Sequence, residues 1–519
     1  MEASARTAFS LRRPAVASGL FVAAALALAL LYDYPRVAGY GPVSLHYWRQ
    51  SDGASIALSY YENGMRFFEP QMHHAAGGDH HAVGEFPVLY YAIAALYHLF
   101  GPEDAVFRIV NFLILLTGLY LFFRVLLDLY ENTWMALFPP LLLLTSPLIA
   151  FYGFNFLPNT TALGTLLMAV YAYYRFVQTQ RAGWYYLAVG AALLTGLLKV
   201  SMLIPALAWG GAAVLCKLFD RRRWAAWFPS WGPLLGGGLL VLGAVAAWYG
   251  WAGRYNAAHN ASHMFLISPT PIWDMDPDYR RWTTEHLTLE QYRMYFTATT
   301  LKVLAVLGGV LLLLPCRVPL PVYLLLLFTA IGSACFLVLF YNQLAIHHYY
   351  IIDLLPLPLL IVSLSLWMVH RYFPGWKRRA LLYFPLLFLL ATNAGAADQQ
   401  MEAYYEPGGE YIPPRFVTLN KRGELGAFLQ AHGIHYPEQA VVVPEISPNV
   451  ALYYLNLRGW NVGTKVDDAA IRQFAEWGAQ YLVILKPEYL DEVDFDWATA
   501  RPIGVFDEQL LFYDISLPE

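Results

Sequence analysis

The run Ala15–Tyr32, AVASGLFVAAALALALLY, leads into a polar connection that contains His46–Gly53, HYWRQSDG. The first run is uncharged and long enough to cross a bilayer as a helix. The connection is too long for a simple turn, and it places an acid, Asp52, among an arginine and aromatic side chains. Together these features predict a membrane fold with its chemistry in a loop at the bilayer surface.

The composition of the whole chain agrees with this interpretation. Of 519 residues, 58% are hydrophobic and 13% are charged, about half the charged fraction of soluble domains. The 16 tryptophans and 37 tyrosines are residues that gather at membrane interfaces. The sequence therefore predicts a polytopic α-helical membrane protein and no nucleic-acid partner. The three cysteines suggest no disulfide framework.

The N-terminal segment carries Arg6, Arg12 and Arg13 before the first apolar run. Basic residues mark the cytoplasmic side, so we expect a cytoplasmic N-terminus and an uncleaved first helix. A cleavable signal peptide is the alternative, but Asp33-Tyr34-Pro35 is a poor small-residue cleavage site.

The run 86–100 is apolar but shorter than the ~20 residues that a spanning helix needs. We interpret it as a juxtamembrane helix that dips into the outer leaflet, which keeps residues 33–104 extracytoplasmic. A true short span is the alternative, and it would invert every later loop.

Ten further apolar segments predict spans, which makes about eleven in all: 105–127, 134–151, 160–176, 184–200, 202–219, 232–251, 298–314, 319–341, 351–369 and 380–396. This topology places nearly every basic cluster of the membrane half inside, as the positive-inside rule requires. The clusters are Arg124, Arg175 with Arg181, Arg221–Arg223, Arg317, and Arg371 with Lys377–Arg379.

The last part of the chain changes character. Residues 398–519 contain no spanning run, and β-like stretches at 440–443 and 480–485 alternate with helix-like runs at 419–432 and 467–477. This pattern predicts a small extracytoplasmic α/β domain that follows a membrane module of residues 1–397.

Two acids in the extracytoplasmic loop are candidates for catalysis, Asp52 and Glu85. Asp52 precedes a helix-like run at 54–61, so the plainer interpretation makes it the N-cap of that helix. Glu85 stands just before the dipping helix, where a capping carboxylate is again the plainer interpretation.

Several cationic or polar groups are expected on the same face as these acids. Arg108 enters the second span, Lys199 ends the fifth, and His347-His348-Tyr349-Tyr350 opens the tenth. Cations at helix ends often only reach toward lipid headgroups. Their convergence on two acids favours a site for an anionic headgroup.

The segment from His73 to His81 holds four histidines and an acid in nine residues. Such a group could bind zinc, but its spacing matches no defined site. We therefore predict no metal ligands, with a divalent metal as the alternative.

Five short motifs, in order, resemble the GT-C glycosyltransferases. They are similar above all to bacterial relatives of dolichyl-phosphate-mannose protein mannosyltransferases and of the lipid A aminoarabinose transferase. The motifs are Trp48-Arg49-Gln50-x-Asp52, Gly84-Glu85-Phe86-Pro87, Phe107-Arg108-x-x-Asn111, Gly196-Leu197-Leu198-Lys199 and His348-Tyr349-Tyr350-x-x-Asp353-x-x-Pro356. The segment from Val443 to Trp460 also resembles the external domain of some bacterial members.

This resemblance implies an inverting transfer of a hexose or pentose from a polyprenyl-phosphate donor to a lipid, glycan or protein acceptor. It implies a bacterial inner-membrane enzyme in which Asp52 is the catalytic acid residue. The expected site is catalytic Asp52 and Glu85; phosphate-binding Arg49, Arg108, Lys199, His347, His348 and Tyr349; and substrate-binding Trp48, Gln50 and Asn159.

One position departs from the family pattern. Many members have Pro-Asp in the first external crossing, and this chain has Pro158-Asn159. The asparagine keeps a hydrogen-bonding shape and loses the charge, which argues against a metal-dependent mechanism.

Two other functional classes remain open from the residues alone. A transporter or flippase would place charges at the bilayer midplane on matched halves. In this chain the polar groups concentrate on one face and the halves do not match. The second class is a scaffold for an envelope-assembly complex, for which only the C-terminal domain would carry information about function.

Overall fold

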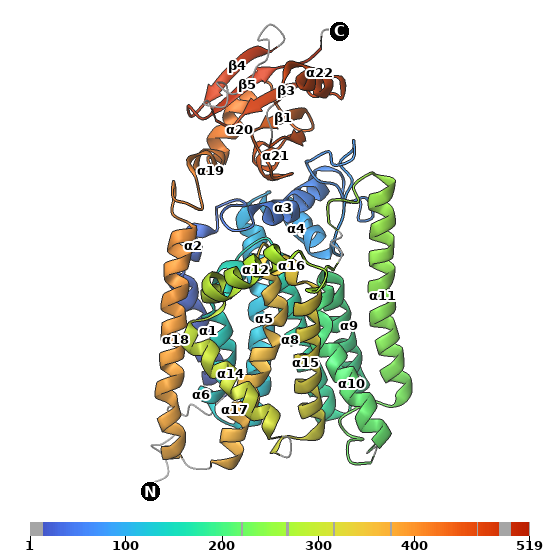
Figure 1. The fold of residues 1–519 in the computed structure, drawn as a ribbon, viewed down its shortest axis with the longest axis vertical. Coiled ribbons are helices and arrows are strands. Elements are labelled where there is room, and N and C mark those ends of the chain that lie inside the picture. The colour runs from blue at the N-terminus through green and yellow to red at the C-terminus, as the bar shows by residue number, and fades with distance from the viewer. Residues whose placement is uncertain are drawn as a thin grey trace. The chain divides into compact units, whose positions relative to one another are not determined.

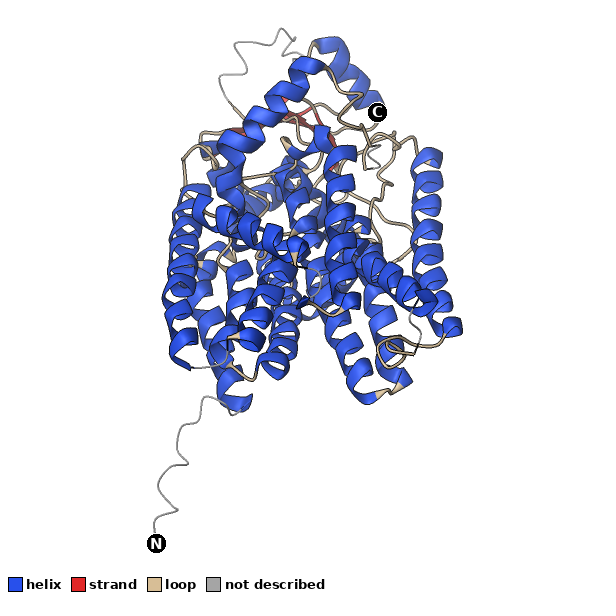
Figure 2. Ribbon diagram, turned by 60° about the horizontal axis from the view of Figure 1, so that its bottom comes forward, coloured by secondary structure: helices blue, strands red, loops and turns tan. Residues whose placement is uncertain are grey.

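The computed structural model describes residues 14–219, 222–265, 269–314, 317–373, 376–463, 466–486 and 500–517, with backbone only for 376–380. The described chain is mainly helical, and its strands lie in the C-terminal part (Figure 2). Arg6, Arg12 and Arg13, which predict the orientation of the first helix, lie outside the described residues.

The chain forms two compact units. The first comprises Met1–Pro35, Asn111–Trp248 and Ser268–Met401, and the second comprises Arg36–Val110, Tyr249–Ile267 and Glu402–Glu519. Four helices have residues in both, namely α2 (Tyr34–Val37), α5 (Asp104–Tyr130), α11 (Trp231–Ala258) and α18 (Trp376–Tyr404).

The first unit is a helical bundle (Figure 1). Its other elements are α1 (Pro14–Leu31), α6 (Thr133–Leu144), α7 (Pro147–Tyr152), α8 (Pro158–Thr179), α9 (Ala182–Leu198), η1 (Val200–Leu203), α10 (Ile204–Phe219), α12 (Pro277–Glu285), η2 (His286–Gln291), α13 (Tyr292–Tyr295), α14 (Ala298–Leu313), α15 (Leu320–Leu339), α16 (Tyr341–Leu344), η4 (His348–Leu354) and α17 (Pro356–Tyr372). All of the predicted spans fall on these helices or on α5, α11 and α18.

Close helix packing in this unit depends on small residues. A Cβ atom on Gly118 of α5 would lie 2.3 Å from the carbonyl oxygen of Gly164 on α8. Only glycine lets the two backbones approach so closely, as is common between membrane helices.

Seven described helices are long and apolar enough to span a bilayer, or eight if the bent pair Pro277–Tyr295 and Ala298–Leu313 counts as one span. The predicted span 134–151 is interrupted, because α6 ends at Leu144 and α7 begins at Pro147. Proline lacks the N–H that would continue a helix and favours the first position of a new one.

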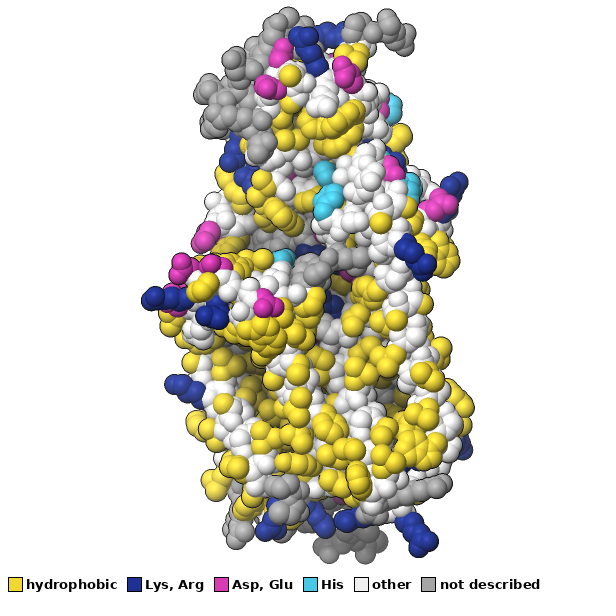
Figure 3. All heavy atoms as spheres, turned by 45° about the vertical axis from the view of Figure 1, so that its right-hand side comes forward, with side chains coloured by type: hydrophobic (Ala, Val, Ile, Leu, Met, Phe, Trp, Pro, Cys, Tyr) yellow, Lys and Arg dark blue, Asp and Glu magenta, His cyan; other side chains and the backbone are white. Residues whose placement is uncertain are grey.

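The surface of the bundle is that of an integral membrane protein. Large apolar side chains point outward, such as Leu239 at 73% exposure and Phe384 at 78%. On the face drawn in Figure 3, hydrophobic side chains cover the helical part, and Lys and Arg gather at its lower end. An exposed apolar surface of this kind is stable only in contact with lipid.

The second unit contains a mixed sheet of order β2-β1-β3-β5-β4. Its strands are β1 (Gln439–Val443), β2 (Arg458–Asn461), β3 (Tyr481–Ile484), β4 (Arg501–Phe506) and β5 (Leu510–Asp514). β1 pairs in parallel with β2 and β3, whereas β5 pairs antiparallel with β3 and β4. The accompanying helices are α19 (Pro414–Leu419), α20 (Arg422–Ala431), α21 (Val450–Leu455) and α22 (Asp468–Glu476). The predicted strands and helices of this region are thus confirmed.

The same unit includes the long loop between the first two spans. The loop carries α3 (Tyr47–Glu62) and α4 (Val88–Phe100), which pack together, and α3 also contacts α21. The loop backbone pairs with β2, since Ala75 N donates to Gly459 O at 2.8 Å. Gly459 has φ of +129°, and a Cβ there would lie 2.0 Å from Ala440 O. Glycine is therefore required where the loop joins the sheet.

Candidate functional site

The first candidate cluster lies on α3, in the second unit. The helix begins at Tyr47, after His46 in a left-handed conformation, so Asp52 lies in its second turn. The N-cap interpretation of Asp52 is therefore wrong. Ser51 and Asp52 favour caps locally, but tertiary packing overrides that preference. Tyr47, for example, packs against Phe416 with 5.0 Å between ring centroids.

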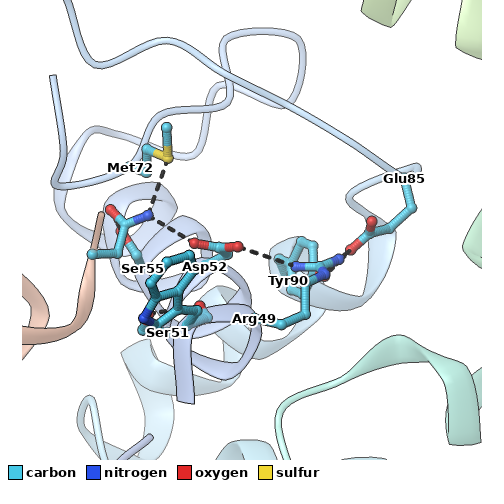
Figure 4. Close-up of polar contacts among 9 residues, drawn as sticks. Arg49, Ser51, Asp52, Ser55, Met72, Glu85 and Tyr90 are labelled. Atoms are coloured by element: carbon cyan, nitrogen blue, oxygen red, sulfur yellow. Dashed lines mark hydrogen bonds and ion pairs between the residues drawn. The ribbon is translucent and has the colours of Figure 1, made fainter. Parts of the chain in front are cut away.

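Arg49 lies between the two acids (Figure 4). One guanidinium nitrogen is 3.9 Å from Asp52 Oδ2, and the other donates to Glu85 Oε1. Tyr90 OH also donates to Glu85. Because α4 starts at Val88 with Pro87 as its N-cap, Glu85 is not a cap. Its carboxylate instead orients the arginine.

The environments of the two acids push their pKa values apart. Burial raises the pKa of Asp52 to about 6, against the charge of Arg49 and a hydrogen bond from Asn449 that lower it. Burial also acts to raise the pKa of Glu85, but Arg49 and Tyr90 outweigh it and hold that pKa below its usual value. A carboxylate with a pKa near 6 is a stronger proton acceptor than an ordinary one and is still ionised at pH 7.

Trp48 and Gln50, the two residues of α3 that are predicted to bind substrate, differ in exposure. Trp48 is 43% exposed, so its indole ring is open to a ligand. Gln50 is fully buried, and its amide donates to Val43 O and Leu45 O, each at 2.7 Å. The geometry gives Gln50 a role in fixing the loop rather than the predicted contact with substrate.

Arg108 is placed differently from what phosphate binding requires. Its side chain is fully buried in the second unit. It donates to Tyr40 O at 3.0 Å, Gly41 O at 3.0 Å and Tyr405 OH at 3.2 Å. A guanidinium engaged by backbone carbonyls holds a loop in place, so the predicted phosphate contact of Arg108 is not favoured by its surroundings.

This placement predicts a loss of stability for Arg108→Gln. Each buried carbonyl left without its donor costs about 1–3 kcal/mol. We therefore expect a clearly lower melting temperature in detergent, measured by intrinsic fluorescence, with Arg66→Gln on the exposed surface as the control. An unchanged melting temperature together with weaker donor binding would restore the phosphate role.

The second candidate cluster lies in the first unit and centres on Asp353. This buried acid accepts hydrogen bonds from Asn159 Nδ2 at 3.0 Å and Ser201 Oγ at 2.5 Å. Lys199 Nζ lies 3.8 Å from Asp353 Oδ2 and 4.1 Å from the ring centroid of Tyr350. The lysine is in extended backbone between α9 and η1, with 22% of its side chain exposed. Asp353 thus holds a partly accessible ammonium group.

The aromatic motif that opens η4 packs around this cluster. His348 Nε2 lies 3.0 Å from Tyr152 OH, and Tyr349 is buried against the same tyrosine. His347 is half-buried and stacks on Tyr350 with 5.6 Å between centroids. His347, His348 and Tyr349 are the three predicted phosphate contacts in this motif. The buried His348 and Tyr349 support the core of the bundle, and phosphate binding by all three stays a prediction. Asp353 belongs to the motif that begins at His348, and the sequence alone predicts no role for it.

A third cluster has the spacing of a metal site. The ligand atoms of Asp79, His81 and His259 all lie within 4.8 Å of one another. His259 Nδ1 is 2.6 Å from Asp79 Oδ2, and His81 Nδ1 is 3.5 Å from Asp79 Oδ1. Of the neighbouring histidines, His73 and His80 are buried and His74 is half-buried. Loss of solvent lowers the pKa of His73 to about 3 and that of His74 and His80 to about 4.

The hydrogen bonds around His81 do not suit a metal ligand. Gln71 Oε1 accepts from Arg458 at 2.6 Å, so the amide NH₂ of Gln71 faces His81 Nε2 at 3.0 Å. A metal-bound histidine normally donates its second ring N–H to an acceptor. Here the group that faces His81 Nε2 is the Gln71 NH₂, which is itself a donor. The cluster fits a carboxylate–histidine pair better than a metal centre.

Known proteins resemble the chain in part of its sequence and in its whole fold. Residues 80–251 match the sequence model of the dolichyl-phosphate-mannose-protein mannosyltransferase family. No curated protein sequence matches. ArnT from Cupriavidus metallidurans, in the apo state, has a similar structure at TM-score 0.58 and 13% identity, covering 96% of this chain and 98% of that one.

Two further structures share the fold. The arabinofuranosyltransferase AftD from mycobacteria gives a TM-score of 0.55 at 14% identity, over 99% of this chain and 42% of that one. The oligosaccharyltransferase of Archaeoglobus fulgidus gives 0.52 at 14% identity, over 92% and 70%.

The fold therefore defines the class: a polytopic helical membrane protein with a small C-terminal mixed sheet, folded like ArnT. Within that fold, the segment 80–251 is similar in sequence to the dolichyl-phosphate-mannose-protein mannosyltransferase family. The resemblance expected from the motifs is confirmed at this level.

Proposed function

We propose that the protein is an inverting glycosyltransferase that moves a sugar from a polyprenyl-phosphate donor to an acceptor hydroxyl. The observation that carries this proposal is the buried Asp52, whose pKa of about 6 suits a general base, beside the Arg49–Glu85 ion pair. The family match supports a lipid-phosphate sugar donor. A second structure of similar fold, ArnT bound to undecaprenyl phosphate at TM-score 0.55, supports the same donor class.

The proposed reaction requires a base for the acceptor hydroxyl and cations for the leaving phosphate. The acceptor hydroxyl gives its proton to Asp52 as its oxygen bonds to the anomeric carbon, and the bond from that carbon to the phosphate oxygen breaks. The leaving polyprenyl phosphate keeps both electrons of that bond as a stable anion, so no general acid is needed. Cations instead stabilise its developing charge.

The described residues include candidates for both the base and the cations. Asp52 is the proposed base, and Arg49 and Lys199 are the proposed cations, with Lys199 held by Asp353. Glu85 orients Arg49, Asn159 helps to hold Asp353, and Trp48 presents an exposed ring to the substrate. A metal is not assigned any step.

The activity is tested directly with purified protein in lipid nanodiscs. Polyprenyl-phosphate hexoses and pentoses are offered with membrane extracts as acceptors, and products are identified by mass spectrometry. Comparing envelope lipids and glycans of a deletion strain with the parent would name the sugar and the acceptor. Movement of the lipid-linked sugar between leaflets without transfer would instead support a transporter.

We further propose about eleven spans in a bacterial inner membrane, in which α6 with α7, α8 and α9 also cross. The N-terminus is then cytoplasmic, 1–397 is the catalytic module, and 398–519 is an extracytoplasmic domain. Positive-inside loops support this orientation, including exposed Arg222 and Arg223.

Cysteine labelling tests this topology. In a cysteine-free background, we expect Asp274→Cys and Ile446→Cys, both exposed, to react with an impermeant thiol reagent in spheroplasts, and Arg222→Cys to react only after lysis. Labelling at 222 with protection at 274 would show that residues 86–100 span the membrane and that the later loops are inverted.

A further inference from the structure

One side chain of the C-terminal domain reaches the proposed base. Asn449 Nδ2 donates to Asp52 Oδ1 at 2.9 Å, across a separation of 397 residues in the chain. Asn449 is fully buried and precedes α21, which contacts α3 within the second unit. The predicted site contains no residue from this domain.

The orientation of the Asn449 amide is fixed by its other partners. Its Oδ1 accepts from the backbone N–H of His74 at 3.0 Å and from Ser55 Oγ at 3.3 Å. A backbone N–H can only donate, so the oxygen must face His74 and the NH₂ must face Asp52. The amide therefore donates to the carboxylate and cannot be flipped without losing both contacts.

Asn449 gives up an ordinary structural role to make this contact. It occupies the N-cap position of α21, where an asparagine side chain usually accepts from the first turn. Here no such capping hydrogen bond forms. A capping hydrogen bond stabilises a helix, so the local sequence preference alone does not explain where the side chain points.

The helix that presents Asn449 is anchored at several points. Tyr453 OH donates to Asp104 Oδ1 at 2.6 Å, Tyr454 OH donates to Pro42 O at 3.2 Å, and Asn456 Nδ2 donates to Glu62 Oε1 at 2.8 Å. These contacts fix α21 against the loop that carries α3. A supporting shell of this kind is what holds a reactive group in place.

We propose that Asn449 is a positioning residue for the transfer reaction: it holds one carboxylate oxygen of Asp52 so that the other can take the acceptor proton. The other oxygen, Oδ2, lies 3.9 Å from a guanidinium nitrogen of Arg49, and 13% of the Asp52 side chain is exposed. The C-terminal domain is then part of the catalytic apparatus. This inference rests on the proposed function of Asp52.

The charges around Asp52 give the inference a measurable consequence. Arg49 on α3 and the Asn449 amide favour the carboxylate, whereas Glu85 opposes it. Removing the amide donor should therefore raise the pKa of Asp52 further. One hydrogen bond to a charged group corresponds to about one pKa unit.

The test compares Asn449→Leu with Tyr453→Phe, which removes an anchoring hydrogen bond of the same helix without touching Asp52. Two readouts are taken: the acidic limb of the pH–kcat profile, and the infrared carboxyl band of Asp52 during a pH titration, with Asp52→Asn as the blank. We expect both to move up by about one pH unit in Asn449→Leu and to stay in place in Tyr453→Phe. The infrared readout requires no substrate.

A second variant, Asn449→Asp, tests the same role if Asn449→Leu does not fold. Asn449→Asp keeps an acceptor for the His74 N–H and replaces only the donor, so a second carboxylate beside Asp52 should shift the limb upward even more. An unmoved band and limb in the Asn449 variants, or an equal shift in Tyr453→Phe, would overturn the positioning role. Full activity of Asp52→Asn would overturn the proposed base itself, which separates the two failures.

Discussion

Replacing Asp52 by asparagine should reduce turnover by about 10²–10⁴-fold, the usual contribution of a general base. The substitution keeps the shape of the side chain and an oxygen that can accept from Asn449. Proton acceptance and the charge beside Arg49 are lost, but Glu85 still pairs with Arg49. Expression, melting temperature and donor affinity should therefore stay close to wild type.

The pH profile of the wild-type enzyme should carry the same signature. Because the pKa of Asp52 is raised to about 6, the base is protonated and inactive below that pH and ionised above it. The rate should therefore rise through about pH 6 and level off toward pH 7–8.

Single-turnover transfer rates of Asp52→Asn test whether Asp52 is the base, with Glu69→Gln as the matched control. Glu69 is an exposed acid of the same loop, paired with Arg66, and its neutralisation should leave the rate unchanged. If Asp52→Asn kept most of the wild-type rate, Asp52 would be removed from the mechanism and Glu85 would become the candidate base.

The second large effect is expected for Lys199→Gln. Removing one donor that stabilises the charge developing in a transition state typically costs about 10²–10³-fold in rate, and we expect a loss of this size for the cation at the leaving phosphate. Charge-assisted contacts to phosphate are also about twice as strong as neutral ones. Both donor affinity and single-turnover rate should therefore fall, while Lys199→Arg should keep part of each.

The alternative is that Lys199 only reaches toward lipid headgroups. Lys302 on α14 is an exposed lysine, so Lys302→Gln shows what the loss of such a residue does. Near-normal donor affinity and rate in Lys199→Gln, equal to those of Lys302→Gln, would leave the phosphate site unassigned. A fall confined to Lys199 would support the ammonium held by Asp353.

The sequence by itself determined the class of fold. Long uncharged runs such as 15–32 must become helices in a bilayer, because hydrocarbon offers no partner for open backbone groups. Short β-branched stretches such as 440–443 likewise predicted strands of the C-terminal sheet, and β1 and β3 lie where they were expected. These features depend on local periodicity and length, which sequence displays directly.

The roles of individual polar residues were decided by tertiary structure. Sequence could place Arg108 and Gln50 near the acids, but it could not show that their donors are taken by the carbonyls of residues 40–45. The partner of a buried polar group depends on which distant backbone segment packs against it, and local pattern carries no record of that.

Asp52 makes the same distinction most clearly. Its identity and its neighbour Arg49 could be read from one motif, whereas its place inside a helix and its bond to Asn449 could not. The raised pKa of Asp52 comes from burial, and burial is produced by segments up to 397 residues away. The sequence determined which chemical groups the protein has, and only the folded chain decided which of them are desolvated, paired and held in position, because those properties arise from long-range packing.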